Sequence, residues 1–343
     1  MENLIDITKY KIGVVGAGSW GTALANLLAL KGAVIDLWVF EDDVRRQIEE
    51  KLENESFLSG IKLSPNIKPT GDIEKVSRDK DMILLVVPSH VMRETAEKMK
   101  PFVSVNTVFV SASKGIENQT YLTMCGVLKE VLTGVPEKNF AALSGPSFAR
   151  EVGEMSPTVV TAASSDSDVA GFVQQIFATP YFRVYKNTDV VGVELGGALK
   201  NVIAIAAGIS DGLDLSLNTR AAVITRGLAE IRKLGLKFGA DPNTFLGLSG
   251  VGDLLLTCTG ELSRNHTVGK LLGEGKSINK ILSEMKMVAE GVKTAKSVYN
   301  LAIKLEVELP ICEEVYHILY DGYSPRDAVH RLMTRSLKDE FGD

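Results

Sequence analysis

The feature that most constrains the fold is a glycine-rich turn near the N-terminus. Residues 11–21 read KIGVVGAGSWG, an apolar strand that delivers Gly16, Gly18 and Gly21 in GxGxxG spacing just before a helical run, 22–30. The first glycine allows a tight turn, the second lets the backbone approach a pyrophosphate, and the third lets the helix pack on the strand. The helix N-terminus adds N–H donors and a positive dipole. This context predicts dinucleotide binding, and the alternative is a glycine-rich turn without a ligand.

The residues after the second expected strand bear on the choice of dinucleotide. Glu41 stands about twenty residues after the third glycine, where a ribose-binding acid is expected. Glu41 and Asp42 would repel a 2′-phosphate, whereas Arg45 and Arg46, one turn later, would attract it. The two acids are also compatible with ordinary first-turn charges of the next helix. The sequence leans toward NAD and leaves NADP open.

Short β-branched runs alternate with helical stretches through the first half of the chain. The expected strands are 12–15, 34–40, 82–87, 107–110, 141–143, 158–162 and 182–185. This alternation indicates βαβ units and a parallel sheet, whereas from Asp189 onward only helices are expected. We therefore predict an α/β protein with a Rossmann-type, doubly wound, mainly parallel sheet over 1–188 and an all-α domain over 189–343. A chain of 343 residues fits two domains.

Composition excludes several classes of partner. The net charge of −5 argues against nucleic-acid binding, which needs a clustered basic surface. The N-terminus lacks the layout of a secretory signal, and the longest apolar runs are far shorter than the ~20 residues that span a bilayer, so neither export nor membrane insertion is expected. The cysteines Cys125, Cys258 and Cys312 have no CxxC spacing and suggest reduced, buried thiols without a metal.

Two polar segments follow predicted strands and should lie at the same sheet edge as the dinucleotide. Lys114 stands in SASKGIE, and Gly145, Ser147 and Ala149 stand in SGPSFARE. The carboxyl ends of parallel strands form the ligand crevice of such sheets. A solvated surface lysine and an ordinary turn are the alternatives.

Lys200 is the sharpest catalytic candidate because it lies inside an apolar helix, 190–209, where charge is costly unless it is partnered or functional. Its neighbours on the same helical face are small or polar: Gly196, Gly197, Asn201 and Ala204. A desolvated lysine has a lowered pKa and can exchange a proton near neutral pH. The alternative is a purely structural ion pair between Lys200 and Asp253.

The segment LSGVGDLLLTCTGELSRNH gathers further polar residues. Arg264 is a candidate phosphate clamp, since its fork of donors matches phosphate oxygens. Ser263 and Asn265 add neutral donors, and Asp253 and Thr257 precede them. Arg264 could instead be an ordinary surface charge.

For three residues expected near the edge of the crevice, the sequence leaves more than one role possible. In VVPSHV, Ser89 is expected to cap the helix that follows Pro88, and His90 is more often structural than catalytic at such a position. Glu290, in VAEGVKT, could cap a helix or contact the cofactor ribose.

These segments together resemble one family. KIGVVGAGSWGTALA, SKGIE, SGPSFARE, NTDVVGVELGGALKNVIAIAAGISDGL, ITRGLAE, GVGDLLLTCTGELSRNH and VAEGVKT are similar, in order and spacing, to NAD(P)-dependent glycerol-3-phosphate dehydrogenase of the bacterial type. The resemblance covers nearly the whole chain. GGALKN with GDLLLTC and SRN is far more specific than GxGxxG.

The resemblance implies reversible hydride transfer between NADH or NADPH and dihydroxyacetone phosphate, giving sn-glycerol 3-phosphate for phospholipid synthesis. It implies that Lys200 is the general acid and base, with Lys114 and Asp253 beside it. The implied substrate positions are Lys114, Gly145, Ser147, Asp253, Ser263, Arg264 and Asn265. The implied cofactor positions are Gly16, Gly18, Ser19, Trp20, Gly21, Phe40, Lys114, Ala149, Arg264, Val288 and Glu290. Phe40 departs from the histidine of some members, and the resemblance also implies a cytoplasmic homodimer without a metal.

Two other functions stay open on the sequence. A β-hydroxyacid dehydrogenase of the same architecture would keep the glycine turn and a catalytic lysine, and Arg264 alone does not distinguish phosphate from carboxylate. A non-catalytic NAD-sensing regulator would have a degraded C-terminal site. The complete set of Lys114, Lys200, Asp253 and Arg264 counts against that regulator.

Overall fold

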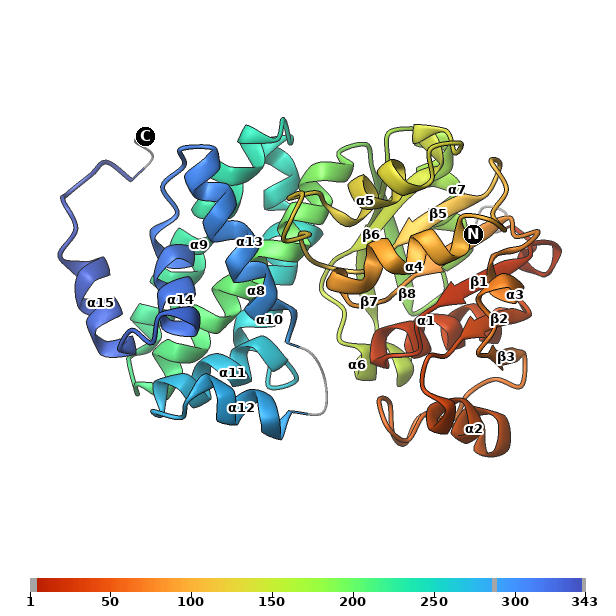
Figure 1. The fold of residues 1–343 in the computed structure, drawn as a ribbon, viewed down its shortest axis with the longest axis horizontal. Coiled ribbons are helices and arrows are strands. Elements are labelled where there is room, and N and C mark those ends of the chain that lie inside the picture. The colour runs from red at the N-terminus through yellow and green to blue at the C-terminus, as the bar shows by residue number, and fades with distance from the viewer. Residues whose placement is uncertain (1–4, 286–288, 341–343) are drawn as a thin grey trace.

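The computed structural model describes residues 5–285 and 289–340, and it consists of a sheet flanked by helices followed by an array of helices (Figure 1). The strands are β1 Ile12–Val15, β2 Ile35–Trp38, β3 Ile67–Thr70, β4 Met82–Leu85, β5 Val108–Ser111, β6 Phe140–Ser144, β7 Thr158–Ser164 and β8 Phe182–Asn187. The helices among them are α1 Ser19–Leu30, α2 Asp42–Lys51, α3 Ile73–Ser77, α4 Met92–Met99, α5 Met124–Val131, α6 Ala149–Gly153 and α7 Ser167–Phe177. The prediction of a mainly parallel, doubly wound sheet with a helical C-terminal domain is confirmed.

The sheet has the strand order β3-β2-β1-β4-β5-β6-β7-β8. Every neighbouring pair is parallel except β6 and β7, which are antiparallel. Side chains of the central strands alternate between two cores, with Val14 and Leu84 in one and Val15 and Leu85 in the other. Helices α1 and α7 pack in the first core and α4 and α5 in the second, so both faces of the sheet are covered.

One strand, β3, is missing from the sequence prediction. Its sequence, IKPT, contains Pro69 and has only one fully buried residue, Ile67. A proline cannot donate to the ladder, so it is tolerated in a strand only at an edge. β3 is the edge strand next to β2, and the apolar pattern that marks the central strands is therefore absent.

The glycine-rich turn between β1 and α1 has the geometry that its spacing predicts. Gly16 has a φ of 111°, which favours glycine. A Cβ on Gly21 would lie 1.9 Å from the carbonyl oxygen of Gly16, so the helix could not approach the turn with any other residue there. Gly18 caps α1, and no atom lies within 4 Å of the point where its Cβ would stand. The start of α1 is therefore open to a ligand.

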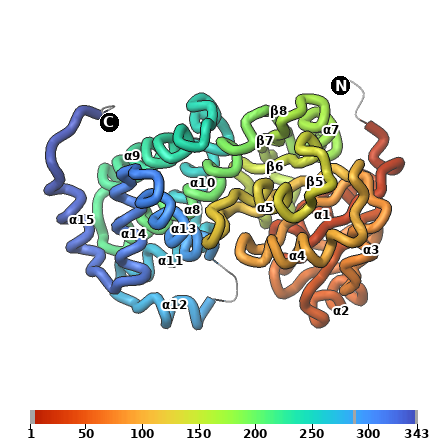
Figure 2. Tube along the Cα trace, turned by 45° about the horizontal axis from the view of Figure 1, so that its top comes forward, coloured from red at the N-terminus to blue at the C-terminus, as the bar shows by residue number. Residues whose placement is uncertain are grey.

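The C-terminal part is all helical. Its helices are α8 Val190–Gly212, α9 Leu217–Lys237, α10 Asp253–Thr259, α11 Arg264–Gly273, α12 Ile278–Glu284, α13 Glu290–Lys304, α14 Pro310–Tyr320 and α15 Pro325–Met333. α8 is long and apolar enough to cross a membrane, but 89% of its most apolar stretch is buried, because it is the core helix against which α9, α10, α11 and α13 pack. α8 runs through the middle of this part and also contacts β6 and β7, and α10 lies on the side that faces the sheet (Figure 1, Figure 2).

Candidate active site

The centre of the site is a single carboxylate that joins the two parts of the chain. Asp253, the first residue of α10, accepts hydrogen bonds from two lysines. Lys114, after the carboxyl end of β5, donates from Nζ to Oδ2 over 2.7 Å, and Lys200, inside α8, donates to Oδ1. Lys200 also donates to Thr257 Oγ1 over 2.7 Å. The Lys200 to Asp253 pair that the sequence left as an alternative is present, and Lys114 extends it across the two parts.

Burial changes the chemistry of this cluster. Asp253 is 1% exposed and Lys200 6% exposed. Desolvation is the main cause that lowers the pKa of the Lys200 ammonium; Asp253 opposes the change and Lys114 adds to it, and the resulting pKa is about 8. Lys200 is therefore mostly protonated at neutral pH, yet it can give up its proton at little cost. That property is needed in a group that exchanges a proton with an alcohol or carbonyl oxygen.

The glycines of GGALKN explain how these side chains come together. A Cβ on Gly196 would lie 2.4 Å from the carbonyl oxygen of Ser249, in the short helical turn η5 Leu248–Gly252 that leads into α10. A Cβ on Gly197 would lie 2.6 Å from Ser144 Oγ and 3.5 Å from Lys114 Cγ. The two glycines let α8 contact both the approach to α10 and the end of β6. Lys200, one turn later on α8, is thereby placed beside Asp253.

The loop after β6 completes one wall of the cluster. The carbonyl oxygen of Gly145 accepts from Lys114 Nζ over 3.1 Å and from Ser147 Oγ over 3.0 Å. The hydroxyl of Ser144 is buried and has no partner among the described residues. Ala149, at the start of α6, follows on the same segment.

Arg264 begins α11, where the Ser263 side chain caps the helix by accepting from His266 N. Arg264 as a whole residue is exposed, and no carboxylate of the described residues lies within ion-pair distance of its guanidinium. Its surroundings lower the pKa of the guanidinium by desolvation, and Glu290 opposes this change. Arg264 remains cationic and is free to bind an anion.

Asn265, next to Arg264, holds three helices together. Its amide donates to Asn201 Oδ1 on α8 over 2.9 Å, and its Oδ1 accepts from the backbone of Gly291 on α13 over 2.9 Å. These bonds fix the position of the α11 N-terminus relative to Lys200. Asn265 retains one amide hydrogen for a further acceptor.

Ser89 does not cap a helix, and that prediction is wrong. Its hydroxyl donates to Glu290 Oε2 over 2.6 Å, and its backbone N–H donates to Oε1 over 3.3 Å. The hydroxyl thus donates to a carboxylate, a charge-assisted hydrogen bond, and does not accept from the backbone N–H groups of the next helix as a cap would. Glu290 lies at the start of α13, so this contact also joins the two parts of the chain. Burial raises the pKa of the Glu290 carboxyl, and the Ser89 bonds oppose that rise. His90 is exposed on the same turn.

The remaining candidate residues for a dinucleotide lie around the first two strands. Ser19 and Trp20 begin α1, and the indole Nε1 of Trp20 is buried without a partner among the described residues. Phe40 follows β2 and is 74% exposed, with its ring 5.9 Å from that of Trp38. Val288 lies outside the described residues. The open cap at Gly18 and the exposed ring of Phe40 fit a dinucleotide.

The sequence places Thr257 close to Asp253 and Asn201 on the same helical face as Lys200, but it predicts no contact for either residue. Thr257 Oγ1 accepts from Lys200 and donates to the carbonyl oxygen of Asp253 over 2.6 Å. The signal for Thr257 was its place one turn after Asp253 on the same helix. The contact between Asn201 and Asn265 had no local signal, because the two residues are on different helices.

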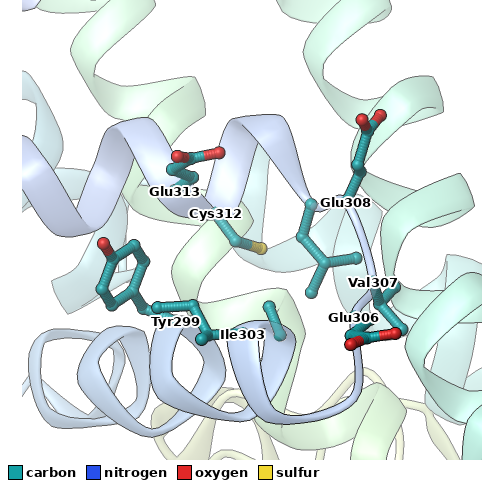
Figure 3. A pocket seen from close by; sticks show the side chains of 9 residues that line it. Tyr299, Ile303, Glu306, Val307, Glu308, Cys312 and Glu313 are labelled. Atoms are coloured by element: carbon teal, nitrogen blue, oxygen red, sulfur yellow. The ribbon is translucent and has the colours of Figure 1, made fainter.

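A separate hollow between α13 and α14 does not belong to this site. Tyr299, Ile303 and Cys312 line it together with the acids Glu306, Glu308 and Glu313 (Figure 3). Three carboxylates would repel a phosphate. The residues that the structure describes contain no grouping of three or more His, Cys, Asp or Glu side chains that could hold a metal.

Comparison with known proteins identifies the family. The model of the NAD-dependent glycerol-3-phosphate dehydrogenase N-terminus matches residues 11–170, and the model of its C-terminus matches residues 189–330. The chain belongs to this family. The resemblance that the sequence motifs carried is therefore confirmed, and as a family member the chain is an oxidoreductase that uses NAD or NADP.

Individual family members agree closely with this chain over their whole length. It is 56% identical to glycerol-3-phosphate dehydrogenase [NAD(P)+] of Geobacter sulfurreducens over 96% of this chain and 98% of that one. The corresponding protein of Syntrophobacter fumaroxidans is 54% identical over 96% and 97% of the two chains. The crystal structure of glycerol-3-phosphate dehydrogenase from Coxiella burnetii superposes with a TM-score of 0.91 at 39% identity, over 95% of this chain and 99% of that one.

Proposed function

We propose that this chain reduces dihydroxyacetone phosphate to sn-glycerol 3-phosphate with NADH or NADPH, and catalyses the reverse reaction, for phospholipid synthesis. The observation that carries the proposal is the buried cluster in which Asp253 holds Lys200 and Lys114 together. The bound dinucleotide supplies a hydride to the ketone carbon. The chain must then give a proton to the ketone oxygen and bind the phosphate.

Lys200 is the proton donor to the ketone oxygen, and the proton acceptor in the reverse direction. Its lowered pKa suits both directions. Asp253 orients the Lys200 ammonium and partly offsets the lowering of its pKa, since a nearby carboxylate favours the charged form. Lys114 adds a second cation, which stabilises negative charge that develops on the substrate oxygen during hydride transfer.

Arg264 is the phosphate clamp. In the described part of the chain no carboxylate lies within ion-pair distance of its guanidinium, so a phosphate does not have to displace a carboxylate. Ser263 and Asn265 supply neutral donors beside it, and Gly145 and Ser147 lie in the loop that contacts Lys114.

The dinucleotide lies along the carboxyl edge of the sheet, at the start of α1. The residues that would hold it are Gly16, Gly18, Ser19, Trp20, Gly21, Phe40, Lys114, Ala149, Arg264 and Glu290, with Val288 beyond the described residues. The binding domain spans 1–188 and the substrate domain 189–343. The enzyme works as a homodimer in the cytoplasm without insertion into a membrane.

The test is an absorbance assay with purified protein, dihydroxyacetone phosphate and either NADH or NADPH. Unphosphorylated dihydroxyacetone is the control, because it has the same ketone and lacks the group that Arg264 binds. Rapid oxidation that requires the phosphate supports the proposal. No oxidation with either dinucleotide, in protein that binds dinucleotide, contradicts the assigned substrate.

A further inference from the structure

We propose that the turn after β2 selects NAD over NADP, because Asp42 and Glu49 hold Arg45 between them. The inference rests on the proposed function only in that the chain binds a nicotinamide dinucleotide. In a Rossmann-type sheet the adenosine ribose lies beyond the carboxyl end of the second strand, here after Trp38. The side chains on this turn therefore meet either the free 2′-hydroxyl of NAD or the 2′-phosphate of NADP.

The first residues after β2 present an aromatic ring and two acids. Phe40 is 74% exposed and offers a face for the adenine. Glu41 precedes α2, and its carboxylate makes no cap hydrogen bond to the helix, so it is available to a ribose hydroxyl. The side chain of Asp42 is 81% exposed. The Glu41 carboxylate favours a hydroxyl donor, and both acids repel a phosphate with a charge of about −1.5 to −2.

Arg45 is the cation that would otherwise attract the 2′-phosphate. Its Nη2 lies 2.8 Å from Asp42 Oδ1 and its Nη1 lies 3.7 Å from Glu49 Oε1. Its Nε is buried and faces Gly71, 4.0 Å from the point where a Cβ on that glycine would stand. The guanidinium is thus held between two carboxylates. Although exposed ion pairs of this kind add little to stability, their combined charge is negative, and a 2′-phosphate would meet that charge.

Arg46 does not replace it. Val44 and Ile48 are the buried residues of α2. Because successive helical residues turn by about 100°, Arg46 lies about 200° from Val44, on the face opposite the core. Arg46 is exposed on this solvent-facing side of α2.

The test measures binding in the absence of substrate, by fluorescence titration with NADH and NADPH. The unchanged protein is expected to bind NADH roughly ten-fold or more tightly than NADPH. In the double variant Asp42→Asn, Glu49→Gln, Arg45 is released and two negative charges are removed. NADPH affinity then rises roughly ten-fold, while NADH affinity changes little. The matched control is Glu50→Gln, an exposed acid on the same helix without an ion pair to Arg45, and it leaves both affinities unchanged.

Two results would overturn the inference. One is equal or tighter binding of NADPH by the unchanged protein. The other is an Arg45→Gln variant that loses roughly ten-fold in NADPH affinity while NADH binding is unaffected, because Arg45 would then contact the 2′-phosphate. Selective NADH binding in a protein that does not reduce dihydroxyacetone phosphate would refute the proposed reaction and leave this inference standing.

Discussion

The carboxylate of Asp253 accepts a hydrogen bond from the buried ammonium of Lys200, and these two residues come from helices that are adjacent in space but 53 residues apart in sequence. The other oxygen of Asp253 accepts from Lys114. One buried anion therefore orients two cations, one from each part of the chain. Because the two cations outnumber the anion, the cluster has a net positive charge, which in the proposed reaction would stabilise the negative charge that develops on the substrate oxygen.

The rate of ketone reduction should fall as the pH rises through about 8, because Lys200 must carry the proton that it donates and its pKa is about 8. Oxidation of glycerol 3-phosphate should rise over the same range, since it needs neutral Lys200. Steady-state kcat measured in both directions between about pH 6.5 and 9.5 gives the two profiles. Profiles that move together, or that stay flat, would exclude Lys200 as the titrating group.

Arg264→Ala should raise the KM for dihydroxyacetone phosphate by about 10- to 100-fold, which corresponds to the loss of a charged hydrogen-bonded contact. At saturating NADH, activity on unphosphorylated dihydroxyacetone should fall far less, because only the phosphate contact of Arg264 is specific to the phosphorylated substrate. Lys270→Ala is the control, since Lys270 is an exposed cation on the same helix. An equal loss on both substrates at saturating NADH would show that Arg264 acts only through the fold or the cofactor and does not bind the phosphate.

Ser89→Ala should weaken NADH binding by several-fold and shift its pH dependence. Ser89 donates to Glu290 over 2.6 Å, and this bond lowers the pKa of a carboxyl that burial raises. Without the bond, that pKa rises further, and the pH midpoint of NADH affinity should move upward. Fluorescence titrations at several pH values measure the shift. Unchanged affinity at every pH would mean that the contact between Ser89 and Glu290 has no part in cofactor binding.

Glu230→Gln should remove part of the pH dependence of stability. Glu230 on α9 accepts from the backbone N–H groups of Ile311 and Cys312 at the start of α14, and burial raises its pKa to about 7. In the unfolded chain the pKa of Glu230 is near 4.5. Between pH 4.5 and about 7 the folded state therefore binds more protons than the unfolded state, and the folded state loses stability as the pH rises through this range. This pKa shift corresponds to a change of about 3 kcal/mol in the free energy of unfolding.

Urea unfolding at about pH 5 and about pH 8 checks this. Over that interval the free energy of unfolding of the unchanged protein should fall by on the order of 3 kcal/mol more than that of the Glu230→Gln variant. Parallel losses in the two proteins would place the titrating group elsewhere.

The parts of the fold that could be predicted are those that a local sequence pattern specifies. The central strands have continuous apolar runs, and the GxGxxG turn imposes its own geometry on Gly16 and Gly21. β3 could not be predicted, because its stability comes from pairing with β2 and its own sequence contains Pro69.

The candidate site likewise has a part that local patterns predict and a part that they do not. Lys200 could be picked out from the sequence because a charged side chain inside an apolar helix is costly unless it has a partner or a function. Ser89 was misassigned because its partner, Glu290, is 201 residues away, and no local pattern reveals a side chain that a distant helix brings into reach.

The most direct test of the account is turnover and NADH affinity measured on the same preparation of Lys200→Ala, with Lys280→Ala, an exposed lysine of α12, as the control. Loss of general acid–base catalysis predicts that kcat falls by about 10²- to 10⁴-fold. NADH affinity should be nearly unchanged, because the glycine turn and the β2 edge stay intact. Turnover close to that of the control, in protein that still binds NADH, would contradict the central claim that Lys200 transfers the proton.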